Sequence, residues 1–500
     1  MAEAPEPTLE LLVLADLHYV GDRRRSCAIP QRRAHWALEL AERAVRRALR
    51  QFRPDAIVLL GDLVDDGLAD ESATDLKALQ LTLQKFDLPI VPVTGNHDGF
   101  LGRVSAAFGV RPGRIELGGY QLISIESQYD AADATRHSEA DLARVASAAV
   151  TRPESPVIVL QHNPILPPIL SSYSYNPLNA NEIHRYFADA RVVLSLSGHY
   201  HAGIPAQEHD GVCYVTAPAL CEAPFRFLRV TLRGRRVEVL EQALQMPSAR
   251  PLWDIHCHTH YAYCRDDVTA QGAIERARLM GLRGLVVTEH AGQLYLPQED
   301  FWKVRFHDDP DLIRRTRHTP SCRMDAYLAE ILPLRDDFIR LGVEVDSDGR
   351  GGITLLDEDK RHWDVVIGAV HWIPRFDPAS ATEAERAQRF MEATEEVIRA
   401  GVHVLAHPFR YFRGGNVERP RHLYRPLARL LAETGVAAEI NFHTNQPDPA
   451  FFALCLEEGA RIALGTDSHS LWEAGELWPH LDVLRQAGCS DGYERVLFTP

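Results

Sequence analysis

The segment at 254–260, DIHCHTH, places three histidines and one aspartate within seven residues. An earlier segment at 15–20, ADLHYV, also contains Asp-x-His. Imidazole and carboxylate groups are common protein ligands of transition metals. The two segments therefore raise the question whether the chain carries one kind of metal site twice or two different sites.

The surroundings of DIHCHTH repeat through the second half of the chain. Short apolar runs end in polar residues in seven segments: WDIHCHTH, LRGLVVTEH, LGVEVD, WDVVIGAVHW, VHVLAHP, VAAEINFH and ARIALGTDSH. Helical patterns lie between several of them, as at 269–280 and at 382–400, which opens with TEAE like a capping box. About seven β/α units predict a parallel sheet closed or nearly closed into a barrel, with the polar residues at the strand C-termini.

This order of motifs resembles the polymerase-and-histidinol-phosphatase (PHP) family, with D-x-H-x-H-T, T-D/E-H, a glutamate after a strand, G-x-V-H, A-H-P and G-S/T-D-x-H. The resemblance covers roughly residues 252–500 and implies a distorted (β/α)7 barrel with a trinuclear metal cluster. It assigns the first ion to His256, His258, Glu344 and Asp467, the second to Glu344, His371 and His407, and the third to His290 and His469.

The third ion is where the sequence departs from the family, which usually supplies a further histidine or acid soon after the second motif histidine. The window at 261–267, YAYCRDD, offers Cys264, Asp266 and Asp267. We predict Asp267, whereas a thiolate at Cys264 would favour Zn. Without a third ligand the cluster would be binuclear.

Other polar residues near these motifs have expected roles outside the ligand set. Asp254 is expected behind the histidines as an acceptor that orients them. His260 is either close to the substrate or structural. Arg410, in AHPFR, is the best candidate for a contact with a substrate phosphate, because a guanidinium group matches phosphate oxygens. Four arginines between 314 and 323 either reach a phosphate or are solvated helix charges.

The first half of the chain repeats the strand-end pattern with other motifs: LELLVLADLH, DAIVLLGD, LPIVPVTGNHD, PVIVLQHNP and RVVLSLSGHYH. Each apolar run reads as a buried strand, and 33–52 reads as a helix. Five strands that all end in metal-competent residues are too many to be explained by chance. The donors suit Mn, Fe, Zn or similar ions. They are Asp16, His18, Asp62, Asn96, His97, His162, His199 and His201.

These blocks resemble the calcineurin-like metallophosphoesterases, whose signature is D-x-H, G-D, G-N-H-D/E, H and G-H-x-H, over roughly residues 8–245. The resemblance implies a four-layer αββα sandwich. It places Asp16, His18, Asp62 and His201 on one ion and Asp62, Asn96, His162 and His199 on the other, with Asp62 bridging. His97 would donate a proton to the leaving oxygen, and Asp98 either orients His97 or belongs to the turn.

Length and composition set the outer limits. Five hundred residues suggest at least two domains, which we place at 1–245 and 252–500 with a linker at 246–251. A net charge of −15 and dispersed arginines argue against long nucleic acid as a partner. No apolar run is long enough for a membrane helix, and the acidic N-terminus does not resemble a signal peptide. Eight cysteines without a Cys-x-x-Cys pair suggest the cytoplasm.

Together these features predict a bifunctional metal-dependent phosphoesterase that acts on small phosphorylated substrates. One domain would open a phosphodiester, and the other would remove the resulting monoester. A nuclease or nucleotide phosphodiesterase on short DNA or RNA is one alternative. Another is that one domain is catalytic and the other is a metal-stabilised regulatory or interaction module. The natural substrate, the metal, the order of the domains and the oligomeric state stay open.

Overall fold

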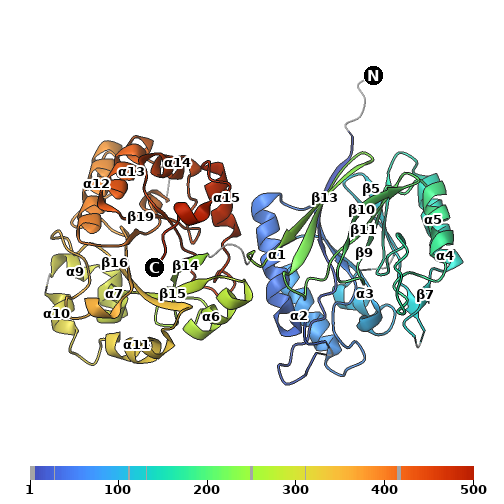
Figure 1. The fold of residues 1–500 in the computed structure, drawn as a ribbon, viewed down its shortest axis with the longest axis horizontal. Coiled ribbons are helices and arrows are strands. Elements are labelled where there is room, and N and C mark those ends of the chain that lie inside the picture. Colours follow the sequence, from blue (N-terminus) through green and yellow to red (C-terminus); the bar gives the residue numbers. More distant parts are fainter. Residues whose placement is uncertain are drawn as a thin grey trace. The chain divides into compact units, whose positions relative to one another are not determined.

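The computed structural model describes residues 6–27, 29–110, 113–130, 132–247, 252–309, 311–413 and 418–500. The chain forms two compact units, Met1–Gln245 and Met246–Pro500 (Figure 1). Most of the expected linker, at 248–251, lies outside the described residues. None of the described helices is both long and apolar enough to cross a membrane.

The first unit contains two β-sheets. In the first sheet the strands pair in the order β13 (Arg236–Ala243), β12 (Arg226–Arg233), β1 (Thr8–Leu14), β2 (Ala56–Leu60) and β3 (Ile90–Val93). In the second sheet the order is β10 (Ile204–His209), β11 (Val212–Thr216), β9 (Leu194–Ser197), β8 (Val157–Leu160), β5 (Tyr120–Ser124) and β4 (Arg114–Leu117). A small separate hairpin is formed by β6 (Gln128–Tyr129) and β7 (Thr135–Arg136).

Helices cover the outer face of each sheet. They are α1 (Ala37–Gln51), α2 (Ser72–Gln84) and α3 (Arg103–Phe108) at the first sheet, and α4 (Glu139–Thr151) and α5 (Ala180–Asp189) at the second. Strand β8 shows the layering. Ile158 and Leu160 join the core between the sheets, whereas Val157 and Val159 pack with residues of α4 and α5. This alternation confirms the predicted αββα sandwich.

The second unit is built on one parallel sheet whose strands follow each other in chain order. They are β14 (Trp253–Cys257), β15 (Gly284–His290), β16 (Ile339–Val345), β17 (Val365–Gly368), β18 (Val404–Leu405), β19 (Ala437–Ile440) and β20 (Ile462–Leu464). A parallel bridge between Cys257 of β14 and Ser468, in the segment after β20, joins the two ends of the sheet. The predicted, nearly closed barrel of seven strands is confirmed.

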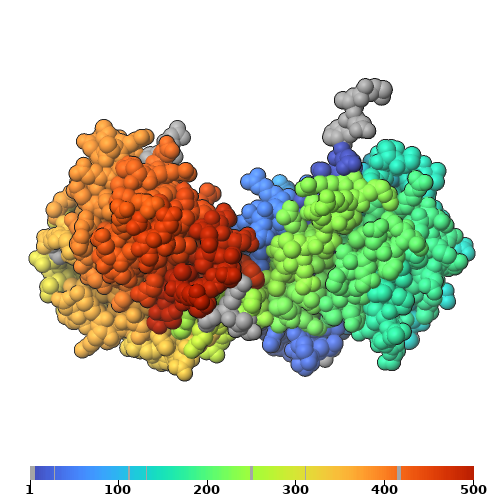
Figure 2. All heavy atoms as spheres, turned by 45° about the horizontal axis from the view of Figure 1, so that its top comes forward, coloured from blue at the N-terminus to red at the C-terminus, as the bar shows by residue number. Residues whose placement is uncertain are grey.

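Helices surround this barrel (Figure 1). They are α6 (Ala270–Leu279), α7 (Ala291–Tyr295), α8 (Gln298–Trp302), α9 (Arg305–Asp308), α10 (Leu312–Thr316), α11 (Met324–Ile331), α12 (Glu383–Arg399), α13 (Tyr424–Thr434), α14 (Pro449–Glu458) and α15 (Trp478–Gln486). The capping box predicted at TEAE is present, because Thr382 and Glu385 exchange hydrogen bonds at the start of α12. In Figure 2, the last part of the chain, in orange and red, makes up much of the visible face of this unit.

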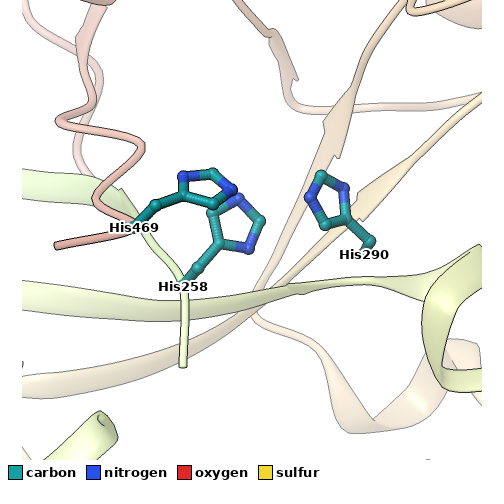
Figure 3. Close-up of side chains that lie close together, drawn as sticks. All are labelled: His258, His290 and His469. Carbon is teal, nitrogen blue, oxygen red and sulfur yellow. The ribbon is translucent and has the colours of Figure 1, made fainter. Parts of the chain in front are cut away.

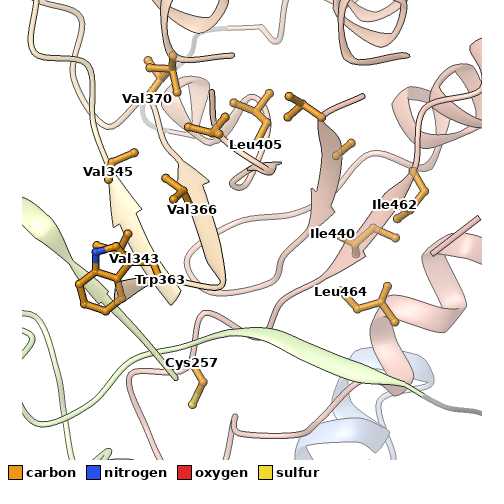
Figure 4. Close-up of a cluster of buried hydrophobic side chains, with 14 of the residues drawn as sticks. Cys257, Val343, Val345, Trp363, Val366, Val370, Leu405, Ile440, Ile462 and Leu464 are labelled. Carbon is orange, nitrogen blue, oxygen red and sulfur yellow. The ribbon is translucent and has the colours of Figure 1, made fainter. Parts of the chain in front are cut away.

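Two apolar layers position the polar residues of the barrel. Val343 and Val345 of β16 belong to the large cluster that packs outward against the helices (Figure 4). Val365 and Ile367 of β17 belong to the smaller cluster inside the barrel. Because side chains alternate along a strand, Glu344 points to the interior, where the other strand ends also aim their polar groups.

Strand β14 also turns its polar side chains to the barrel interior, but it does so through a β-bulge. Its register against β15 shifts between Asp254 and Cys257, where one extra residue is accommodated. Ile255 lies in the inner apolar cluster, whereas Cys257 lies in the outer one. The bulge therefore lets His256 and His258 face the interior above Ile255.

Candidate metal centres

In the first unit the structure brings together the eight strand-end residues that the sequence singled out. They follow β1 (Asp16, His18), β2 (Asp62), β3 (Asn96, His97), β8 (His162) and β9 (His199, His201). Most of them are buried, and the exposed fraction of the Asp16, His18 and His162 residues is 0%. Burying so many polar side chains together costs free energy unless they share a binding partner such as a metal ion.

One half of this cluster is formed by Asp16, His18 and His201, which could share an ion. The Nε2 atoms of His18 and His201 lie 3.2 Å apart, and His201 Nε2 lies 3.6 Å from Asp16 Oδ1. Two nitrogens bound at about 2.0–2.1 Å to one tetrahedral ion would be about 3.3 Å apart. The spacing therefore fits two ligands of one cation.

The other half is formed by Asp62, His162 and His199, with Asn96 beside them. His162 Nε2 lies 3.3 Å from Asp62 Oδ2 and 3.2 Å from Asn96 Oδ1. Asp62 Oδ2 is also 3.5 Å from His18 Nε2 of the first half. Asp62 thus stands between the two groups, as a bridging carboxylate must.

Hydrogen bonds hold the imidazoles from behind. His162 Nδ1 donates to the Leu60 carbonyl at 2.7 Å, and His201 Nδ1 contacts Glu222 at 2.6 Å. His97 Nδ1 donates to the Asp65 carbonyl at 2.7 Å. Each contact occupies one ring nitrogen and leaves the other for the pocket. Sequence reasoning missed Glu222, since no motif marks it.

Asp98 belongs to the turn. Its buried carboxylate accepts the backbone N–H groups of Leu63 at 2.7 Å, Val64 at 3.1 Å and Gly95 at 2.8 Å. It therefore ties the loop after β2 to the loop after β3. The orientation of His97 comes from the Asp65 carbonyl instead.

The electrostatics of this pocket suit a cation. Burial lowers the pKa of His18 to about 4 and that of His199 to about 3, so both rings are neutral near pH 7. Metal-binding imidazoles must be neutral. Burial also acts to lower the pKa of His162, but the Asp62 carboxylate raises it to about 9, which shows how strongly this acid attracts positive charge in the metal-free pocket. Within the described residues His199 Nε2 is buried without a hydrogen-bond partner. The donor set and this orphaned atom fit a bound metal.

The backbone at these positions is strained. Asp16, His18, Asp62 and His199 have φ values of 51°, 47°, 50° and 68°, and Asp467 of the second unit has 52°. Positive φ is uncommon in residues other than glycine and collects at functional sites. The strain supports a role for these residues beyond packing.

In the second unit, the predicted ligands of the first ion meet inside the barrel. His256 Nε2 and His258 Nε2 are 3.2 Å apart. Asp467 Oδ1 lies 3.0 Å from His258 Nε2, and Glu344 Oε2 lies 3.5 Å from His256 Nε2. The four groups come from three strands and converge on one point.

Glu344 also faces the residues assigned to the second ion. Its Oε1 lies 3.1 Å from His407 Nε2 and 3.5 Å from His371 Nε2. His371 Nδ1 in turn contacts Asp346 at 2.8 Å. Glu344 therefore occupies the same position between two groups as Asp62 does in the first unit.

Glu439 is a buried carboxylate that sequence reasoning missed. Its Oε1 accepts His256 Nδ1 at 2.8 Å, and its Oε2 accepts the backbone N–H of His407 at 2.8 Å. It holds one residue of the first predicted ion group and one of the second. The only sequence signal was its place in AAEI, a polar residue within an apolar strand.

The third group contains His290 and His469, with His258 alongside (Figure 3). The ring centres of His258 lie 4.3 Å from His290 and 4.4 Å from His469. Cys264 completes this group. Its Sγ lies 3.1 Å from His469 Nε2 and 3.5 Å from His290 Nε2.

Asp267, which we predicted as the third ligand, makes a different contact in the structure. The Asp267 carboxylate accepts the backbone N–H of Leu471 at 2.8 Å, and Asp266 accepts Ser470 Oγ at 2.7 Å. Both acids therefore fasten the loop after β20 while Cys264 turns towards the histidines. Burial acts to raise the pKa of Cys264, but the neighbouring His290 and His469 lower it to about 4.

Three other expectations concern residues at the edge of this centre. Asp254 accepts the Thr466 hydroxyl at 2.7 Å and the Thr466 N–H at 3.0 Å, so it braces the loop after β20 instead of an imidazole. His260 Nε2 lies 3.5 Å from the Glu330 carboxylate, and both side chains are exposed. Arg410 Nη1 donates to Asp467 Oδ2 at 2.7 Å.

Each centre opens into a cavity, and the two cavities differ in charge. The cavity of the first unit, about 690 Å³, is lined by His97 and Asn96 together with Asp65, Asp66, Asp130 and Asp133. The cavity of the second unit, about 650 Å³, is lined by His290, His371 and His469 together with Arg410 and Arg413. Among the described lining residues, the first has no Lys or Arg, and the second has no Asp or Glu.

Comparison with known families agrees with both sets of motifs. The family model of the calcineurin-like phosphoesterases matches residues 9–203, and that of the PHP domain matches residues 254–443. The chain is a fusion of these two families. Both families are metal-dependent, and the clusters described above contain side chains that could bind metal.

Similar proteins are known for parts of the fusion. Metallophosphoesterase 1 of Gallus gallus is 25% identical over 43% of the chain and 66% of its own length. A protein of Acetivibrio thermocellus named as a phosphatase is 25% identical over 37% of the chain and 78% of its own length. Metallophosphoesterase 1 of Ailuropoda melanoleuca is 31% identical, but the chain covers only 27% of it.

Two solved structures resemble single halves of the fusion. A dimetal phosphatase from Danio rerio covers 48% of the chain with a TM-score of 0.38 and 16% identity, over 99% of that protein. A structure assigned as a histidinol phosphatase from Listeria monocytogenes covers 46% of the chain with a TM-score of 0.36 and 14% identity, again over 99% of its length.

Proposed function

We propose that the fusion is a bifunctional, metal-dependent phosphoesterase in which both domains hydrolyse small phosphate esters. The convergence of buried carboxylates and imidazoles on a shared acid in each domain, Asp62 and Glu344, carries this proposal. Divalent ions held there would polarise a phosphoryl group and supply an activated water. We propose two ions in the first domain and three in the second, with Mn, Fe or Zn as candidates.

Residues beside the ligands have distinct roles in this scheme. His97 lines the first cavity, and its Nδ1 is held by the Asp65 carbonyl, so its Nε2 is free to donate a proton to the leaving oxygen. Arg410 lines the second cavity next to Asp467 and would bind phosphate oxygens. Cys264 would complete the third ion group and favour Zn there.

The opposite charge of the two cavities supports a division of labour. A phosphodiester carries one negative charge, whereas a monoester carries nearly two near pH 7. The acid-lined first cavity opposes added negative charge, and the arginine-lined second cavity favours it. We therefore propose that the first domain opens a diester and the second removes the remaining monoester. Tethering would raise the effective concentration of the intermediate.

All eight cysteines are free in the structure. This supports a reducing compartment, and we propose that the protein works in the cytoplasm.

A stepwise substrate tests the proposal. Bis(4-nitrophenyl) phosphate would be converted first to 4-nitrophenyl phosphate and then to free phosphate. Asp62→Ala, which removes the shared acid of the first centre, should leave the diester uncleaved, and His371→Ala should accumulate the monoester. His209→Ala, which changes an exposed histidine on β10, is the control and should behave like the unchanged protein. Completion of both steps by each active-site variant would refute the division of labour.

A further inference from the structure

The cavity of the PHP domain has an aromatic wall that the phosphate chemistry does not require. Phe301, Trp302 and Trp372 all line it. Their ring centres lie 5.1 Å apart for Phe301–Trp302, 5.4 Å for Phe301–Trp372 and 6.5 Å for Trp302–Trp372. The three rings therefore form one continuous surface contributed by α8 and the segment after β17.

This wall offers its most accessible ring at the cavity. Phe301 is buried, whereas Trp302 is 44% exposed. An exposed aromatic side chain beside a binding cavity offers a flat face on which a planar ligand group can stack. Trp372 connects the wall to the centre, because its ring lies 5.5 Å from that of His371.

A pair of arginines also lines the cavity. Arg410 bonds to Asp467 Oδ2, while Oδ1 of the same carboxylate faces His258. Arg413 donates to the Thr444 hydroxyl. Burial lowers the pKa of Arg413, and the nearby Arg410 lowers it further. Two guanidinium groups that line the cavity beside the candidate ligands offer donors that match phosphate oxygens, which places a phosphate next to these ligands.

We propose that this cavity binds a phosphate monoester that carries a planar aromatic group, such as a nucleobase or an aryl ring. The phosphate lies between Arg410 and the metal centre, and the ring covers Trp302 and Trp372. The cavity of about 650 Å³ is large enough for both parts. This inference rests on the proposed monoesterase function and adds the class of substrate.

The experiment uses the full chain with Asp62→Asn, so that hydrolysis reports on the second domain. Three monoesters are compared: adenosine monophosphate, phenyl phosphate and glycerol 2-phosphate. We expect kcat/KM to be at least roughly ten-fold higher for the two esters with a ring, mainly through a lower KM. Trp302→Phe should keep this preference. Trp302→Leu should remove it, so that the three esters are hydrolysed with similar kcat/KM.

The arms separate the possible failures. Equal kcat/KM for all three esters in the Trp302-containing protein would overturn the inference while leaving the monoesterase intact. So would equal behaviour of the Phe and Leu variants, because a general apolar contact would then suffice. A preference for adenosine monophosphate over phenyl phosphate would identify the ring as a nucleobase. No hydrolysis of any monoester by metal-loaded protein would instead refute the proposed function.

Discussion

Glu439 shows at the scale of one residue how a carboxylate outside the motifs supports the proposed centre. It accepts His256 Nδ1 and the backbone N–H of His407, so its removal frees both groups. We expect Glu439→Gln to weaken metal binding in the second domain by about 10–100-fold. Competition of Mn or Zn with a chelating dye measures this change. Glu330→Gln, at an exposed position, is the control, and equal affinities in the two variants would contradict the role.

Cys264 makes a spectroscopic prediction. A thiolate ligand gives Co(II) a charge-transfer band in the near ultraviolet, which imidazole and carboxylate do not produce. The Co(II)-loaded protein should therefore show this band, and Cys264→Ser should lose it. Cys322→Ser, which changes a partly exposed thiol of the same unit, should keep it. A band that survives Cys264→Ser would show that the third group uses another ligand.

At the scale of structural elements, the loop after β3 depends on a residue without a side chain. A Cβ atom at Gly95 would lie 2.2 Å from Asp62 Oδ1. The φ of Gly95, −101°, is open to any residue, so it is the lack of space that excludes a side chain here. Gly95→Ala should displace Asp62 and remove the ions of the first domain. Gly211→Ala meets open space at a φ of 74°. It should cost about 1–2 kcal/mol of stability but retain the metal. The metal content of the two variants tests this prediction, and equal metal content in both would contradict it.

The segment before α4 predicts a pH effect on stability. His137 is buried, and among the described residues neither ring nitrogen has a hydrogen-bond partner. Burial lowers its pKa from 6.5 to about 4. The unfolded chain therefore binds this proton first, and stability is lost as pH falls from about 6.5 towards 4. The loss from this group is about 3 kcal/mol at pH 4.

Calorimetry of metal-free protein measures this loss. The unchanged protein should lose about 3 kcal/mol more stability between pH 7.5 and pH 4 than His137→Leu does. The same pH dependence in both proteins would show that His137 is not held neutral by burial.

The sequence predicted the strands better than it predicted which strands pair and which side chains meet. Apolar runs ending in polar groups identify strands, and seven of them in β/α alternation are enough to expect a barrel. The pairing of β12 with β1 within one sheet joins segments that lie far apart in the chain, which no local pattern encodes. The choice between Cys264 and Asp267 likewise depended on the path of one loop. Glu222 and Glu439 are distant in sequence from the histidines they hold, so only the fold reveals them.

At the scale of the whole molecule, the contrast between the two cavities predicts opposite salt effects. Anionic monoesters drawn by Arg410 and Arg413 should bind more weakly as ionic strength rises, so KM in the second domain should increase. The acid-lined first cavity should show a flat or reversed dependence for a diester. Initial rates in increasing KCl, with Asp62→Asn and Glu344→Gln used to isolate each domain, test this. A parallel loss in both domains would contradict the charge argument.

Metal content tests the central claim most directly, because both proposed activities require two separate centres. We expect the metal-loaded chain to hold about five ions by mass spectrometry, two in the first domain and three in the second. Asp62→Ala should lose the first two without affecting the rest, and Glu344→Ala should lose at least two from the second centre alone. A chain that binds no stoichiometric metal, or in which either change empties both centres together, would contradict the account.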